Sequence, residues 1–450
     1  MTANRSAVLH RNLRVDPPVA VRGDGAWIIE AGGRRVFDGC GGAAVSCLGH
    51  SHPKVIEAIR RQVGQLAFVH SGAFTSEPAE ALARHLVDRA PQGFGNGATM
   101  FLGSGSEAME AALKLARQYW IEKGEPSRGR IIARDMAYHG NTLGALAAGG
   151  HAGRRAPYAP LLIDVARIPA CHAYRGRAED ETPEDYGRRM ADALEAEIAV
   201  LGPENVCAFV VEPVGGATMG CVPPAPGYFR RLREICDRHG VLMIADEVMC
   251  GMGRTGTLFA MEQEGVTADL YVIAKGLGAG YQPIAGMMVC ETVLDAIRGG
   301  SGALANGHTY MSHPAACAGA LAVLETIEEE GLLEAVNRLG ARLRAGLESR
   351  LGAHPQVGDI RGRGLFQAFE IVADRGSKSP FPPAAGIAAR FKQEALAAGL
   401  LCYPSAGGVD GTQGDHVLLA PPFISREADI DFVADVCAAT LDRVLDRAAA

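Results

Sequence analysis

Short apolar runs, each bounded by charged or turn-forming residues, recur through the middle of the chain. Residues 241–245 and 270–274 form two of these runs, and residues 131–133 and 209–211 form shorter ones. Within each run apolar side chains follow one another without polar alternation, which is typical of strands buried on both faces of a parallel sheet. Because helical patterns alternate with these runs, we predict an α/β domain with a largely parallel sheet.

One helix is predicted just before these strands. Apolar residues at positions 108, 111, 112, 115 and 116 follow the helical period. Ser104 and Glu107 have the spacing of a capping box, which places the start of the helix near them. Glu110 and Lys114 are spaced to form an ion pair on the exposed side of the same helix.

The pattern divides the chain into three segments. Residues 1–60 contain a predicted hairpin between Trp27 and Phe37, with Gly32 and Gly33 at its turn. Residues 61–310 carry the alternating pattern of the large domain. Residues 311–450 predict a smaller α+β domain, which the N-terminal segment completes. In this domain one long helix is expected to end near residue 331, and a second to span residues 332–351. The last helix of the chain has apolar residues at positions 430, 433, 437, 441 and 444.

Composition restricts the classes of function. The chain has 450 residues, of which 48% are hydrophobic and 21% charged, as in ordinary globular proteins. A formal net charge of -7 argues against nucleic-acid binding, and no apolar stretch has the length of a signal peptide or membrane span. Eleven scattered cysteines, without a Cys-x-x-Cys pair, favour reduced thiols in the cytoplasm. No acidic or cysteine partner for His50 and His52 is evident from the sequence, so we expect no metal.

Each of the two longer apolar runs ends in a charged residue. Asp246 follows residues 241–245, and Lys275 follows residues 270–274 and precedes the glycine-rich stretch 276–280. Open α/β sheets bind ligands at the carboxyl ends of their strands, and glycines let backbone approach a ligand closely. A lysine and a carboxylate held there suit pyridoxal phosphate, because the amine forms a Schiff base with its aldehyde and the acid pairs with its pyridinium nitrogen. Taken alone, the same two charges could simply solvate the rim of the sheet.

Two further motifs could complete such a site. The predicted helix start at Ser104, Gly105 and Ser106 offers N–H groups and hydroxyls to a phosphate, although most capped helices bind none. Tyr138 follows the run 131–133 and precedes a glycine by two residues, so its ring could stack on a flat cofactor. Taken alone, Tyr138 is more often a core or rim aromatic, and His139 more often a hydrogen-bonded structural histidine.

Together, these motifs resemble those of one enzyme family. In chain order they are Ser104-Gly105-Ser106-Glu107-Ala108, Tyr138-His139-Gly140, Glu212-Pro213, Ala245-Asp246-Glu247-Val248, Ala274-Lys275-Gly276 and His308-Thr309-Tyr310. The set is similar to that of the class III aminotransferases, which are fold-type I pyridoxal-phosphate enzymes and include the ω-transaminases. The resemblance extends from about residue 23 to residue 445. It implies a large domain with a mostly parallel seven-stranded sheet flanked by helices, and a smaller α+β domain.

The resemblance implies a chemical role for four of these residues. Lys275 is the expected Schiff-base lysine, and Asp246 is the expected partner of the pyridine nitrogen. Tyr138 is expected to stack on one face of the cofactor ring. Glu212 is expected to lie near the ring and to help shape the substrate pocket.

Other residues are implied to hold the cofactor. Ser104, Gly105 and Ser106 are expected to bind its phosphate, and Val248 to pack on the ring face opposite Tyr138. Thr309 is expected to reach the cofactor of the neighbouring subunit in a homodimer. The resemblance therefore implies pyridoxal 5'-phosphate as cofactor and a second copy of the chain as partner.

The expected reaction moves an amino group from an ω-amino acid or simple amine to a 2-oxo acid by a ping-pong mechanism. Racemases, a decarboxylase and phospho-lyases belong to the same family, and Lys275 and Asp246 do not separate these reactions because all share carbanion formation. A non-catalytic pyridoxal-phosphate sensor is a third hypothesis, which the intact lysine–aspartate pair disfavours. The motifs specify neither the donor, the acceptor nor the stereochemical preference.

One segment departs from the family pattern. Many relatives have an arginine that binds the carboxylate of the acceptor shortly before a Gly-Asp and a Pro-Pro pair. The corresponding residues here, 407–423, contain no arginine. Carboxylate recognition is therefore expected to come from elsewhere. Arg361 and Arg363 are candidates, although a structural role in the smaller domain is the commoner one for such residues.

Overall fold

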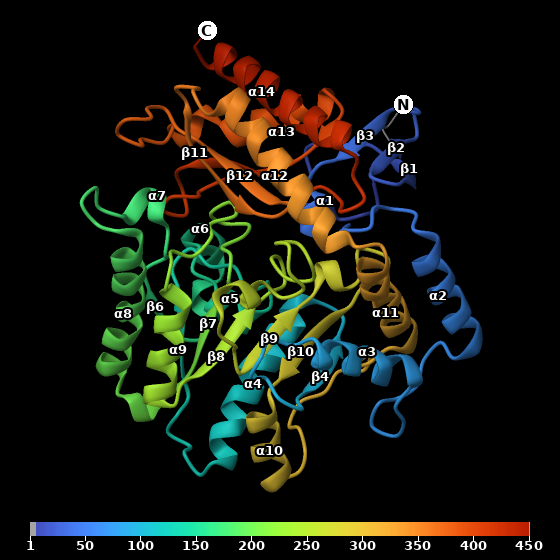
Figure 1. Cartoon of the computed structure of the whole chain (residues 1–450), viewed down its shortest axis with the longest axis vertical. Coiled ribbons are helices and arrows are strands. Elements are labelled where there is room, and N and C mark those ends of the chain that lie inside the picture. The colour runs from blue at the N-terminus through green and yellow to red at the C-terminus, as the bar shows by residue number, and fades with distance from the viewer. Residues whose placement is uncertain (1–5, 450) are drawn as a thin grey trace.

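A seven-stranded sheet lies at the centre of the computed structural model, which describes residues 6–449 (Figure 1). The strand order is β4 (Ala98–Leu102), β10 (Ala285–Val289), β9 (Leu270–Ile273), β8 (Leu242–Asp246), β7 (Val206–Val211), β5 (Arg130–Arg134) and β6 (Ala166–Ile168). Strand β10 runs antiparallel to both of its neighbours, whereas the pairs from β9 to β6 are parallel. The prediction of a mostly parallel seven-stranded sheet is confirmed.

Helices cover this sheet because its strands are apolar on both faces. Every residue of β7, β8, β9 and β10 is buried. Helix α4 (Gly105–Glu122) packs across β4, β10, β9, β8 and β7, while α8 (Pro183–Leu201) and α9 (Tyr228–His239) pack on each other and on β6 and β8 respectively. The carboxyl ends of the parallel strands therefore emerge at one edge, between the sheet and the C-terminal part of the chain (Figure 1).

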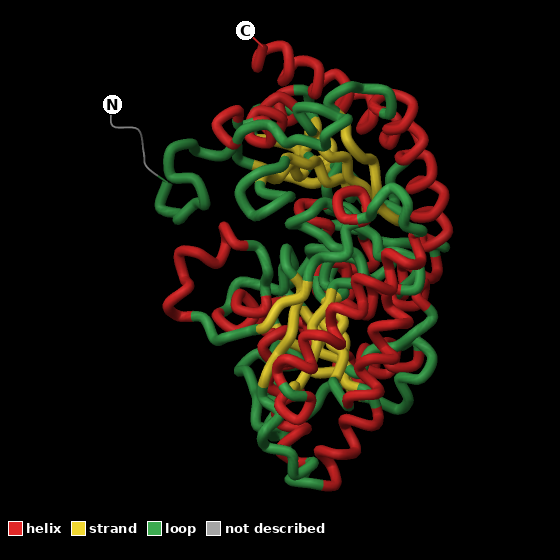
Figure 2. The backbone as a smooth tube through the Cα atoms, turned by 90° about the vertical axis from the view of Figure 1, so that its left-hand side faces the viewer, coloured by secondary structure: helices red, strands yellow, loops and turns green. Residues whose placement is uncertain are grey.

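A second group of strands is formed by the C-terminal part of the chain, and Figure 2 shows it separated from the large sheet. Its antiparallel order is β11 (Val357–Arg363), β12 (Phe366–Ile371), β15 (Asp415–Leu419) and β14 (Tyr403–Ala406). Helices α12 (Leu332–Leu351) and α13 (Ile387–Ala397) pack on it, and α14 (Glu427–Ala449) packs on α12 and α13. Helix α11 (Pro314–Glu329) precedes them and packs on α2 (Pro53–Gln65) and α3 (Glu77–Asp88).

The N-terminal strands join this C-terminal part. Strands β1 (Ala20–Asp24), β2 (Trp27–Glu30) and β3 (Arg35–Asp38) form a sheet that β13 (Leu400–Leu401) extends by pairing parallel to β3. Phe37 is fully buried, with its ring centroid 5.2 Å from that of Trp27 and 6.3 Å from that of Phe432 on α14. The predicted hairpin is present, and its apolar side packs on residues nearly 400 positions further along the chain.

Shorter elements connect these layers. The remaining helices are α1 (Gly41–Ala44), α5 (Leu143–Ala148), α6 (Ala152–Arg155), α7 (Ala173–Gly176) and α10 (Glu291–Gly299). The 3-10 helices are η1 (Ala156–Leu161), η2 (Pro203–Asn205), η3 (Ala260–Glu264), η4 (Lys275–Leu277) and η5 (Pro383–Ala385).

Three features of residues 6–449 bear on other classes of site. None of their helices is long and apolar enough to span a membrane. All eleven cysteines are buried and unpaired. No group of three or more His, Cys, Asp or Glu side chains in this part of the chain is placed to hold a metal ion.

Replacing Phe37 by alanine should destabilise the protein by about 3–5 kcal/mol, because the change leaves a cavity between the N-terminal sheet and α14. The matched control is Val200→Ala, since Val200 is 79% exposed and its change should cost less than about 0.5 kcal/mol. Thermal and urea unfolding of the two variants measure the difference. Equal stability of the two would show that the aromatic contact does not join these segments.

Candidate active site

A cavity of about 270 Å³ opens at the carboxyl edge of the large sheet. Five segments that follow strands β4, β5, β7, β8 and β9 line it, and with them come eight of the nine site residues expected from the sequence: Ser104, Gly105, Ser106, Tyr138, Glu212, Asp246, Val248 and Lys275. Thr309 is exposed and does not line the cavity. Residues as far apart in the sequence as Val45 and Ile284 thus share one small space.

The amino end of α4 forms one wall of this cavity. Ser104 is its N-cap, and the Ser104 hydroxyl accepts a hydrogen bond of 3.2 Å from the backbone N–H of Glu107. The Glu107 carboxylate accepts from the N–H of Gly103 at 2.8 Å rather than from that of Ser104, so the predicted box closes one residue earlier than expected. An N–H-rich helix end with a positive dipole suits a phosphate group.

The prediction of an exposed ion pair between Glu110 and Lys114 is wrong. The Glu110 carboxylate accepts hydrogen bonds from the backbone N–H groups of Gly144 and Ala145, at 2.8 and 3.1 Å. Lys114 instead donates to the side chain of Asn306 at 2.8 Å. Because Glu110 satisfies the first N–H groups of α5, it fixes the loop before α5 against α4.

That loop, residues 138–142, packs tightly on the start of α4. The Ser106 hydroxyl accepts a hydrogen bond of 2.9 Å from the N–H of Asn141. Gly140 has a φ of +139°, and a Cβ at this position would lie 2.7 Å from the Ser106 Oγ and 2.9 Å from the Ser106 Cα. Gly105 is similarly close to Val248, whose methyl groups would lie 3.1 Å from a Cβ. Because Gly105 and Gly140 have no side chain, the segments of this wall can pack closely.

Asp246, at the end of β8, is a buried carboxylate with two partners. Its Oδ2 lies 2.8 Å from Nδ1 of His139, and its Oδ1 accepts from the N–H of Val248 at 3.0 Å. Asp246 is 4% exposed and His139 is 3% exposed. A buried carboxyl group needs such partners, so His139 and the N–H of Val248 hold the orientation of Asp246. His139 is thus hydrogen-bonded, as its more common structural role predicts, but its partner is a residue of the site.

Glu212 follows β7 and also lines the cavity. One of its carboxylate oxygens accepts from the N–H of Gly216 at 3.1 Å, and the other from the N–H of Tyr138 at 3.3 Å. Burial raises the pKa of the Glu212 carboxyl, while the nearby His139 and Arg134 oppose the rise. Glu212 therefore fixes the backbone of the segment that carries Tyr138.

Lys275 begins η4 directly after β9, with a φ of +45°, which is uncommon for a residue with a side chain. Its amine forms no hydrogen bond or ion pair with the residues that the structure describes, and it lines the cavity. Burial lowers the pKa of the Lys275 amine, although the carboxylates of Asp246 and Glu212 oppose this change. The amine is thus easier to deprotonate than a lysine in water.

Further lining residues had no signal in the sequence. Val45 comes from the N-terminal part, Met249 follows β8, and Gln282 and Pro283 precede β10. Single apolar or amide residues in loops have no periodicity or charge that would indicate a site. Only their position in the fold brings them to the cavity.

A family model described as Aminotransferase class-III matches residues 10–441. The chain belongs to the class III aminotransferases. It is 44% identical over 426 residues to an uncharacterized aminotransferase of Schizosaccharomyces pombe, a match that covers 94% of this chain and 92% of the relative. It is also similar to an (S)-enantioselective omega-transaminase from Thermomicrobium roseum, with a TM-score of 0.91 and 35% identity over 97% of this chain and 96% of that one.

A third similarity concerns an omega-transaminase from Pseudomonas jessenii, whose structure was solved in complex with PMP. The TM-score is 0.91 at 31% identity, over 99% of this chain and 97% of that one. These matches confirm three predictions for this class III aminotransferase: its family, its α/β fold and its aminotransferase activity.

Gly140→Ala should weaken the binding of pyridoxal phosphate about tenfold or more, because the added methyl group pushes the start of α4 away from the loop 138–142. Gly265→Ala is the matched control, since Gly265 also has a positive φ, +67°, but has open space around it. Titration of both apo-variants with pyridoxal phosphate measures the two dissociation constants. An unchanged constant for Gly140→Ala would contradict the role of this contact.

Proposed function

We propose that this class III aminotransferase uses pyridoxal 5'-phosphate to move an amino group from an ω-amino acid or simple amine to a 2-oxo acid. One observation carries the proposal: the amine of Lys275 and the carboxylate of Asp246, fixed by His139, line the same cavity at adjacent strand ends. A lysine and a buried acid in this arrangement match the two reactive ends of that cofactor.

The residues present fit the cofactor in three respects. The amino end of α4, with Ser104, Gly105 and Ser106, suits its phosphate. Val248 and Tyr138 line the cavity and could contact the two faces of a flat ring. Asp246 would hold a proton on the ring nitrogen, because His139 and the N–H of Val248 stabilise it as a carboxylate.

When bound, pyridoxal phosphate supplies an aldehyde that condenses with amines and a ring that accepts an electron pair. Lys275 would be the residue that bonds to this aldehyde. Because burial lowers the pKa of Lys275, its Nζ can hold or release a proton close to a bound substrate. Glu212 would keep Tyr138 in place during these steps through its hydrogen bond to the Tyr138 N–H.

Racemisation, decarboxylation and elimination use the same first steps, so a half-reaction separates them from transamination. The loaded enzyme is mixed with a panel of amines and amino acids without an acceptor, and the absorption spectrum of the cofactor is followed. Transamination converts the cofactor to its amino form with some donor. A cofactor that stays in the aldehyde oxidation state while substrate is racemised or cleaved would assign the other reaction class.

Lys275→Ala should lower the rate of the half-reaction by more than about 1,000-fold, because the variant lacks the amine that moves the proton. Stopped-flow spectra with the best donor measure the rate. Added methylamine should restore part of it, since a small amine can occupy the space of the missing side chain. A Lys275→Ala variant with the wild-type rate would overturn the mechanism.

We also propose a homodimer in the cytoplasm. Its interface is supported by the exposed aromatic residues Phe68 and Tyr310, 40% and 67% exposed, whose rings contact each other at 5.7 Å between centroids. Thr309 is exposed beside them, and in this assembly it would contact the phosphate in the second copy. The eleven buried, unpaired cysteines support a location in the cytoplasm, because thiols stay reduced there.

Mixed dimers test whether Thr309 acts across the interface. A Lys275→Ala subunit paired with a Thr309→Ala subunit should have one site with both changes and one intact site, and therefore about half of the wild-type activity. The two variants are given different affinity tags, coexpressed and purified through both tags. If Thr309 acts within its own subunit, the mixed dimer has no intact site, and its activity will not exceed half that of the Thr309→Ala homodimer.

A further inference from the structure

Arg154 places a guanidinium group beside the active-site cavity. Its Cζ lies 4.7 Å from the ring centroid of Tyr138, and Tyr138 lines the cavity. The guanidinium forms no hydrogen bond or ion pair with any residue between 6 and 449, although the side chain is partly buried. An arginine that stacks on an aromatic ring keeps the N–H groups at the edge of its plane available to a ligand.

The backbone around Arg154 is held in place by packing. Arg154 belongs to the short helix α6, and its N–H donates to Nδ1 of His151 at 3.3 Å. A Cβ on Gly153 would lie 2.6 Å from the carbonyl oxygen of Gly411, and a Cβ on Gly407 would lie 3.0 Å from Nε2 of His151. Helix α6 therefore sits directly on the turn between β14 and β15, which contains no arginine or lysine.

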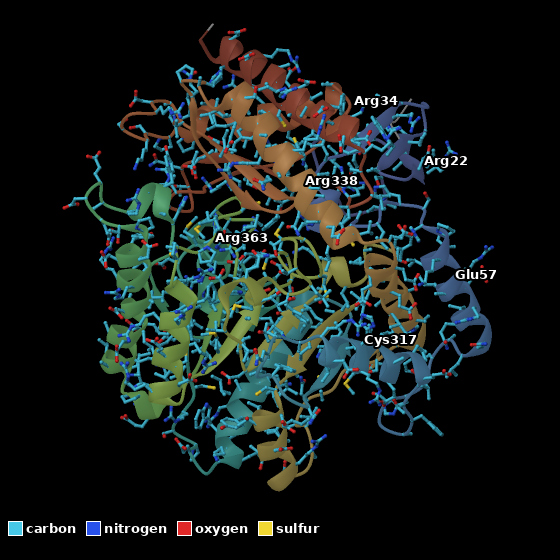
Figure 3. All side chains as sticks on the ribbon, viewed as in Figure 1. Arg22, Arg34, Glu57, Cys317, Arg338 and Arg363 are labelled. Carbon is cyan, nitrogen blue, oxygen red and sulfur yellow. The ribbon has the colours of Figure 1, made fainter. Side chains whose placement is uncertain are left out.

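The other arginines suggested for substrate recognition are already paired. Arg361 is buried, and its Nη1 lies 2.8 Å from the Glu370 carboxylate. Arg363, where the C-terminal part meets the large sheet, lies 2.6 Å from the carboxylate of Glu264 (Figure 3). Both hold structural contacts, as their more common role predicts.

The acidic residues of the cavity wall make a second positive group necessary if the substrate carries a negative charge. Asp246 and Glu212 bring two acidic groups to its wall, while Lys275 is the amine expected to react. A substrate carboxylate entering this space is repelled unless another positive group lies nearby. Arg154 is close enough for its charge to act on Lys275, since it adds to the effect of burial in lowering the pKa of Lys275.

We propose that Arg154 binds the carboxylate of the 2-oxo acid acceptor, from its position over Tyr138 beside the cavity. The proposal rests on the aminotransferase function above and adds the residue that selects carboxylate-bearing substrates. A planar guanidinium can donate two parallel hydrogen bonds to a carboxylate. In this arrangement α6 supplies the residue that recognises the carboxylate. The turn of residues 407–414 packs against α6 and holds it in position.

Acceptors with and without a carboxylate test the assignment. With 1-phenylethylamine as donor, Arg154→Gln should lower kcat/KM for pyruvate about 10- to 100-fold and leave kcat/KM for propanal within about twofold of wild type. Arg155→Gln is the matched control, because it removes the same charge from the next residue, which acts on Asp135 and Arg167 instead. Arg155→Gln should leave the ratio of the two values unchanged.

A binding measurement without turnover makes the result independent of the reaction. Calorimetric titration of the loaded enzyme with propionate should give an affinity at least about tenfold lower in Arg154→Gln than in wild type, while propionamide binds both equally. The affinity for pyridoxal phosphate should stay the same. Failure of every donor to react in the wild type would refute the proposed function, yet the propionate titration would still decide the role of Arg154.

Three outcomes would overturn the assignment. Equal losses with pyruvate and propanal would make Arg154 a packing residue, and weaker binding of pyridoxal phosphate would make it a phosphate ligand. Unchanged affinity for propionate in Arg154→Gln would show that another group receives the carboxylate.

Discussion

The hydrogen bond between His139 and Asp246 is the interaction on which the rest of the site depends. A carboxyl group with 4% exposure needs hydrogen-bond partners around it, and His139 and the N–H of Val248 are those partners. The bond joins the segment after β5 to the end of β8. Because Tyr138 precedes His139 and donates its N–H to Glu212, the segment after β7 is held by the same arrangement.

Close packing shapes one wall of the cavity, and burial changes the pKa of its lysine. Gly105 and Gly140 allow the start of α4 to approach Val248 and the loop before α5, and the residues of this helix start line the cavity. Burial lowers the pKa of Lys275 although two carboxylates are nearby. The start of α4 and a readily deprotonated amine thus line the same cavity, as the proposed amino-group transfer requires.

Much of the fold follows from local pattern. Unbroken apolar runs predicted strands β8 and β9, the helical period predicted α4 and α14, and two glycines marked the hairpin that ends in β3. Burial on both faces demands apolar residues whatever the neighbours are, so these elements are visible in the sequence. The charged residues Asp246 and Lys275 were equally visible, because each stands directly after such a run.

The sequence by itself therefore determined the elements, the motif order and the family, whereas the tertiary structure decided which side chains meet. Glu110 was spaced to pair with Lys114, but it binds the first N–H groups of α5, since unpaired helix ends need partners more than an exposed lysine does. Arg154 lies on a helix too short to show a period, and only the contact of α6 with the turn after β14 places it over Tyr138. Spacing makes a contact possible, but packing between distant segments selects it.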